Sequence, residues 1–311
     1  MSIRAVRLSI RKGSFMSVKS HRNASDVSSK QKNCKLPRVN WHEAATCAFK
    51  IELVDYADIL EFITEYILGK NYHRIDLLII KKLAAVTIPK NMALIFRTFN
   101  LLEIKGIGSS VGTDSYYKMI GYAGLFINQT GEPNQYSALD VSLTFLSMHY
   151  PRKLIKHLKR ERKLTVAKVY PGVYYINKET FVAQIIVTKE LPPEDNIYLH
   201  FLTDRVWNGT LAECLADDYK EHQDEELYRR YMHQITLAGN RAKGEGDMFI
   251  CEGLLNLCGT SSEEIIERTK KEDAEYYQPR IDSLSSQNAY LKSLLIQHNI
   301  PFNVEMEDNA E

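Results

Sequence analysis

The spacing of apolar residues divides the first part of the chain into a helix followed by strands. Between Trp41 and Ile59 apolar side chains recur every three or four residues, which predicts a helix with one buried face. Residues 61–68 and 74–82 alternate or are rich in β-branched side chains, and the turn residues 69–71 between them complete the pattern of a hairpin. Residues 99–105 predict a third strand.

Helices and strands continue to alternate through the middle of the chain. Asp114 is a suitable N-cap for a helix, and Pro151 favours the start of a basic helix over residues 152–163. The strand expected at 141–146 places its hydroxyl residues on one side, which predicts one wetter face. Further strands are expected at 166–170, 172–177 and 181–188. This order predicts an α/β fold in which helices flank a central sheet.

Charged helices dominate the chain beyond Asn208. Ser261 and Glu264 have the spacing of a capping box and predict the start of a helix. Pro279 is expected to limit the length of the last helical stretch. That stretch has the seam of a short coiled coil, with one polar position: Ile281, Leu284, Asn288, Leu291 and Leu295. A homodimer through this helix and packing of the helix on its own chain are both consistent with the pattern.

Net charge is uninformative for the whole chain but not for its first forty residues. The chain has 40 basic and 39 acidic residues, whereas residues 1–40 contain ten Lys or Arg against Asp26 alone. A disordered basic arm over residues 1–38 is the preferred interpretation, a transit peptide is the alternative, and Met16 is a second candidate start. No apolar run approaches the roughly 20 residues of a membrane span. Five cysteines without a CxxC pair favour a reducing cytoplasm.

Three charged residues on two expected strands form the main candidate for chemistry. Glu103 and Lys105 lie two positions apart in a strand, so they share one face. If the strand that contains Asp76 is a neighbour, then Asp76 and Glu103 converge as oxygen ligands for Mg²⁺ or Mn²⁺, with Lys105 beside them. A cation held in this way polarises a phosphate, and the lysine orients water or neutralises charge. Glu52 lies on the inward face of the first helix and is a candidate third acidic group.

The order of these residues resembles the PD-(D/E)XK nuclease superfamily: a helix with Glu52, a hairpin, Asp76 in a strand, then Glu103-Ile104-Lys105 and another helix. The segments RIDLLIIKK, FNLLEIKG, DSYYKMIGYAGLF and YPRKLIKHLKRER look like those of uncharacterised bacterial proteins related to nuclease-like transposases and recombination-promoting nucleases. The resemblance spans roughly residues 41–206, and Ile75 stands where the superfamily usually has proline. It implies a restriction-endonuclease-like domain over 39–206, and the charged helical pattern beyond it predicts a helical region over 207–311. It also implies Asp76 and Glu103 as metal ligands and Lys105 as the catalytic lysine.

Basic residues supply a candidate DNA surface. Arg152, Lys153, Lys156, Lys159 and Arg160 make the expected basic helix cationic, with an apolar stripe behind them. Lys118 is expected to face phosphate, because Tyr117, Ile120, Gly121 and Gly124 have the spacing of that helix's packing face. The resulting hypothesis is a metal-dependent DNA endonuclease. The alternative is a catalytically inactive nuclease scaffold that binds nucleic acid or mediates assembly, and an internal salt bridge between Lys105 and Glu103 is the purely structural reading.

Overall fold

The computed structural model of the chain describes residues 40–69, 73–83, 85–106, 109–129, 134–202, 209–241 and 258–298. The predictions for the basic arm and for Met16 therefore lie outside the described residues. Within them, no helix is long and apolar enough to cross a membrane.

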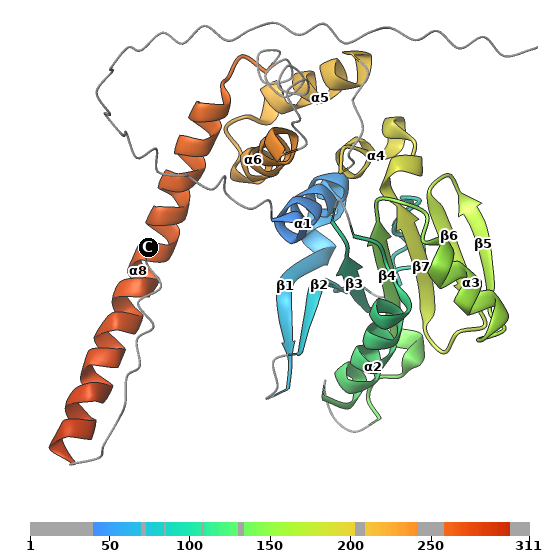
Figure 1. The fold of residues 1–311 in the computed structure, drawn as a ribbon, viewed down its shortest axis with the longest axis horizontal. Coiled ribbons are helices and arrows are strands. Elements are labelled where there is room, and N and C mark those ends of the chain that lie inside the picture. Colours follow the sequence, from blue (N-terminus) through green and yellow to red (C-terminus); the bar gives the residue numbers. More distant parts are fainter. Residues whose placement is uncertain are drawn as a thin grey trace, which may run out of the picture. The chain divides into compact units, whose positions relative to one another are not determined.

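The strands of the described residues form one mixed sheet of seven strands, in the order β1-β2-β3-β4-β7-β6-β5 (Figure 1). Strands β1, β2 and β3 make an antiparallel meander, and β4 and β7 run parallel to β3. Strand β6 pairs antiparallel with β7, and β5 completes the sheet antiparallel to β6. Their bounds are β1 Leu60–Leu68, β2 His73–Lys81, β3 Phe99–Ile104, β4 Val141–Ser147, β5 Thr165–Tyr170, β6 Val173–Asn177 and β7 Val182–Val187. The predicted α/β class with a mixed sheet is confirmed.

Helices precede, cover and follow this sheet. The longer ones are α1 Trp41–Glu52, α2 Thr113–Gln129, α3 Arg152–Arg160, α4 Pro193–His200, α5 Gly209–His222, α6 Glu226–Arg241 and α8 Ser262–Gln297. The first helix ends earlier than expected, because Leu53 leaves the helical conformation and a 3-10 turn, Val54–Ile59, follows. Ser261 and Glu264 form the predicted capping box. The expectation for Pro279 is wrong, since α8 continues through it to Gln297.

Two hydrophobic cores lie on the two faces of the sheet. Helices α1 and α4 cover one face, whereas α2 and α3 cover the other (Figure 1). Side chains of α5, α6 and the first turns of α8, including Leu215, Tyr231 and Ile265, belong to the same core as α1. The described C-terminal helices are thus anchored to the α1 side of the sheet.

The packing corrects the expected packing face of α2. Helix α2 buries Ser115, Tyr116, Met119, Ala123 and Phe126, so Tyr117, Gly121 and Gly124 lie outside and not on the packing face. The larger apolar side chains, one turn apart, take the sheet side of the helix.

The expected wetter face of β4 is in fact fully buried. Ser142 donates to Asn100 Oδ1 at 2.6 Å, and Gln184 donates both to Thr144 Oγ1 at 3.0 Å and to the carbonyl oxygen of Met92 at 2.7 Å. The irregular segment that contains Met92 covers this face, so hydrogen bonds within the protein take the place of water.

Candidate functional site

Asp76 lies where β2 loses regular pairing with both of its neighbours. On one side, the pairs Thr64↔Leu77 and Tyr66↔Ile75 flank Glu65, which faces Asp76 and has a φ of 48°. A positive φ is strained for a residue other than glycine, and such strain concentrates at functional sites. On the other side, pairing with β3 ends at Leu77↔Leu102, one step before Asp76 would meet Glu103. The backbone pairing of β2 is therefore interrupted at Asp76, which leaves room for its carboxylate beside the end of β3.

The Asp76 carboxylate is held by a backbone amide and approached by a histidine. The amide of Ile104 donates to Asp76 Oδ2 at 2.7 Å, and His42 Nδ1 lies 3.8 Å from Asp76 Oδ1. Burial raises the pKa of Asp76, and the negative charge of Glu103 raises it further, while the Ile104 amide opposes the rise. Asp76 and Glu103 therefore form a pair of carboxylates that repel each other.

Glu103 is a fully buried carboxylate with an ammonium group on each oxygen. Its side chain is 0% exposed, Lys105 Nζ lies 2.7 Å from Oε1, and Lys118 Nζ from α2 forms an ion pair with Oε2. Lys118 also lies over the Tyr122 ring, 5.7 Å from its centroid. The structure thus brings Asp76, Glu103 and Lys105 together, as the sequence predicted, and adds Lys118, which the sequence assigned to phosphate instead.

Gly106 fixes the end of β3 beside α1. A Cβ at this position would lie 2.3 Å from Trp41 Cδ1, so only glycine allows the indole to pack against the backbone here. This contact connects the segment with Lys105 to the first turn of α1, which also carries His42.

Glu52 is buried at the opposite end of α1, away from this site. It accepts a hydrogen bond from the Tyr198 amide at 2.8 Å, and Lys90 Nζ lies 3.8 Å from Oε2. Burial raises the pKa of Glu52 to about 7. Ten residues separate Glu52 from His42, roughly 15 Å along a helix. The predicted third acid therefore pairs with α4, and the α1 residue beside Asp76 is His42.

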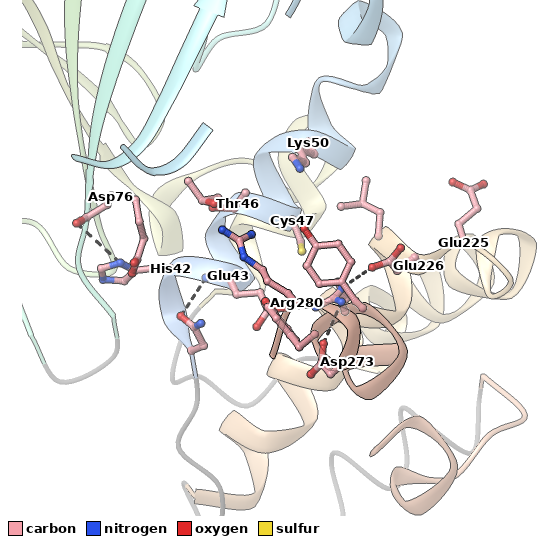
Figure 2. A pocket seen from close by; sticks show the side chains of 17 residues that line it. His42, Glu43, Thr46, Cys47, Lys50, Asp76, Glu225, Glu226, Asp273 and Arg280 are labelled. Carbon is pink, nitrogen blue, oxygen red and sulfur yellow. Dashed lines mark hydrogen bonds and ion pairs between the residues drawn. The ribbon is translucent and has the colours of Figure 1, made fainter. Parts of the chain in front are cut away.

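Asp76 and His42 line one end of a cleft of about 1310 Å³ that is bounded by α1, β1, α6 and α8 (Figure 2). Acidic side chains outnumber basic ones in the lining. The acidic residues are Glu43, Glu65, Asp76, Glu225, Glu226 and Asp273, and the basic residues are Lys50, Arg230 and Arg280. Three of the acids, Glu43, Glu226 and Asp273, share ion pairs with Arg230. Such a lining disfavours a polyanion inside the cleft.

The predicted basic helix presents its cations to solvent. Leu154, Ile155 and Leu158 are buried as the apolar stripe of α3. Arg152, Lys153, Lys156, Lys159 and Arg160 are exposed, and no ion pair joins these five to an acid within the described residues. Helix α3 lies on the same face of the sheet as α2, and Tyr117 Oη and His157 Nε2, 3.0 Å apart, connect the two helices. A cationic surface therefore borders the face from which Lys118 reaches Glu103.

No known protein family, curated protein or solved structure matches this chain. The chemistry must be argued from the site itself. Among the described residues, no group of three or more His, Cys, Asp or Glu side chains is arranged to hold a metal ion. The site offers two carboxylates, which is the number that Mg²⁺ commonly takes from a protein when water and substrate oxygens complete its shell.

The sequence did not point to His42, and it assigned Lys118 to phosphate without predicting the ion pair of Lys118 with Glu103. His42 carries no local signal, because its approach to Asp76 depends on how α1 packs against the sheet. Lys118 could have been found from Met119 and Ala123, whose spacing with Tyr116 defines the buried stripe of α2 and places Lys118 at its margin.

Proposed function

We propose that the chain is a metal-dependent DNA endonuclease of the PD-(D/E)XK type, in which Asp76 and Glu103 hold the cation. The observation that carries this proposal is the meeting of Asp76, Glu103 and Lys105 at the opening between β2 and β3. The order α1, β1–β2 hairpin, β3, α2, β4 supports the same assignment, because it is the order on which the resemblance to this superfamily depends.

The donor set fits a divalent cation. Both carboxylates are largely withdrawn from water, and their mutual repulsion raises the pKa of Asp76. Hard oxygen donors of this kind suit Mg²⁺ or Mn²⁺. When bound, such a cation would supply Lewis-acid polarisation of a phosphate oxygen.

The residues of the chain supply the remaining functions. Lys105 and Lys118 are about one-third exposed, with side chains 28% and 33% accessible, so their ammonium groups can reach a phosphate at the surface of the site. There they would neutralise the charge that develops during hydrolysis. The Ile104 amide keeps Asp76 in place. The DNA backbone would lie across α2 and α3, since the exposed cations of α3 border this face and the cleft on the α1 side is acidic.

A plasmid-nicking assay with Mg²⁺ or Mn²⁺ tests the proposal. Asp76→Asn keeps an acceptor for the Ile104 amide but removes the charge, and Lys105→Ala removes the ammonium group. We expect each to lower the rate by roughly 10²-fold or more. Asp58→Ala, at an exposed carboxylate in the 3-10 turn, is the matched control and should cleave at the wild-type rate. Equal activity in all four proteins would assign the cleavage to another site or to a contaminant.

The second candidate is a nuclease-like scaffold that binds nucleic acid without cleaving it. One observation favours it: a lysine ammonium group lies at each oxygen of Glu103, so the charge of the carboxylate is compensated without a metal ion. Calorimetric titration with Mn²⁺ separates the two functions. Uptake that Asp76→Asn abolishes supports the endonuclease, whereas salt-sensitive DNA binding without any uptake supports the scaffold.

A further inference from the structure

The second half of α8 has no covering in the described part of the chain. Its first turns are anchored, because Ile265 and Thr269 are buried and Arg230 holds Asp273 at 3.0 Å. From residue 274 to residue 293, by contrast, every side chain is exposed. A lone helix of this length is only marginally stable in water, and its apolar side chains add to the cost of exposure.

Five residues of this half have heptad spacing and fall on one stripe, whereas the exposed Tyr276, Tyr290 and Ile296 lie outside it. Ile281, Asn288 and Leu295 occupy the a positions, and Leu284 and Leu291 occupy the d positions. Ile281, Leu284 and Leu291 are 51%, 53% and 55% exposed, so large aliphatic side chains of one helix face are open to solvent. Pro279 occupies an f position on the opposite side of the helix, so its ring does not enter the stripe.

We propose that this stripe binds the same stripe of a second copy of the chain, as a parallel two-stranded coiled coil. The residue types select this occupant. Ile281 at an a position, combined with Leu at both d positions, favours two parallel strands, and the single Asn at an a position fixes register by pairing with itself across the interface. An identical chain in register places Asn288 opposite Asn288, where the two amides can hydrogen-bond to each other.

The flanking charges permit this pairing. In the parallel arrangement, each g position faces the next e position of the partner chain, so Arg280 meets Ser285 and Gln287 meets Lys292. No two like charges come together. The interface has only five core positions in each chain, so we expect a weak dimer with a Kd in about the micromolar range.

Sedimentation equilibrium of the full chain tests the proposal. The mass should rise from 35.8 kDa towards twice that value between about 1 and about 100 µM. Leu284→Ser and Leu291→Ser should each weaken association by roughly tenfold or more. Ile296→Ser is the matched control, because Ile296 is 66% exposed but occupies a b position outside the stripe. A chain that stays monomeric, or a control that weakens association as much as the stripe variants, overturns the proposal.

Two further variants test register and orientation. Asn288→Leu should tighten association and produce species larger than the dimer, because the polar residue that restricts the oligomeric state is gone. Leu284→Cys should form a disulfide-linked dimer on mild oxidation, at a level above that of the wild type, whose exposed Cys214 sets the background. Failure of the cross-link in a dimeric protein would refute the parallel arrangement. These readouts are masses, so they are independent of any nuclease activity.

Discussion

The pH dependence of stability tests whether Glu52 is buried and protonated, as the structure indicates, or is a ligand of a metal ion. Burial raises the pKa of this carboxyl from 4.5 to about 7, against the opposing effect of the Tyr198 amide and of Lys90. Between these two pH values the folded chain holds a proton that the unfolded chain has already released. Raising the pH through this window therefore favours unfolding, and the stability that depends on protonated Glu52 is lost above about pH 7.

The size of the effect follows from the two pKa values. Each tenfold change in proton affinity is about 1.4 kcal/mol, so the free energy of unfolding should fall by about 3 kcal/mol across the window from Glu52 alone. Glu52→Gln removes the titration and keeps a carbonyl oxygen for the Tyr198 amide. Lys90 is 31% exposed and can turn to water in the variant.

Urea unfolding of the two proteins at several pH values from 5 to 8 measures the effect. The difference in unfolding free energy, variant minus wild type, reports Glu52 alone, because the other titrating groups cancel. This difference should rise with pH and level off above about pH 7, where Glu52 is ionised in the folded wild type. Glu61→Gln, at an exposed carboxyl in β1, should give a difference that does not change with pH. A flat difference for Glu52→Gln would refute the reasoning. If calorimetry showed that Glu52→Gln loses Mn²⁺ binding, the result would instead support the sequence prediction that Glu52 is the third acidic group of the proposed site.

Three other changes probe the site and its supports. Lys118→Met removes one of the two lysine ammonium groups that pair with Glu103 and compete with a metal ion for it. Calorimetry should therefore show that Mn²⁺ binds roughly tenfold more tightly to the variant. Unchanged or weaker Mn²⁺ binding would contradict this competition between Lys118 and the metal ion. Lys156→Ala, on exposed α3, should weaken DNA binding equally for all sequences and reduce the slope of log affinity against log salt by about 1, as measured by fluorescence anisotropy; an unchanged slope would place the DNA elsewhere. Gly106→Ala forces a Cβ against Trp41 and should cost about 1–3 kcal/mol by thermal unfolding, whereas Gly112→Ala, which meets no neighbour, should cost less.

The part of the site that the sequence predicted depends on short-range rules. Alternation along β3 places Glu103 and Lys105 on one face, and the antiparallel register of β2 with β3 aligns Asp76 with Glu103. The seven strands likewise lie where the spacing along the chain predicts them. Their order in the sheet, by contrast, depends on pairing between segments far apart in the chain.

The features that the sequence did not predict all depend on contacts between distant elements. The partner of Glu52 is the Tyr198 amide, 146 positions later, and no local pattern indicates that α4 packs there. Lys118 turns inward because the larger side chains of α2 take the sheet face, which brings its ammonium group to Glu103. The opening of the sheet at Asp76 depends on where the pairing of β2 with β3 ends, which no local pattern indicates.

Charge balance connects these contacts to the proposed function. When both carboxyls are ionised, Asp76, Glu103, Lys105 and Lys118 carry two negative and two positive charges, so the four side chains are neutral together. A divalent cation at the carboxylates would leave the two ammonium groups without partners in a largely buried site, which is unfavourable. A phosphate backbone lying over α2 and α3 would offer them new partners and free Glu103. On the proposed function, DNA and cation should therefore strengthen each other's binding, and linkage requires the two effects to be equal in free energy.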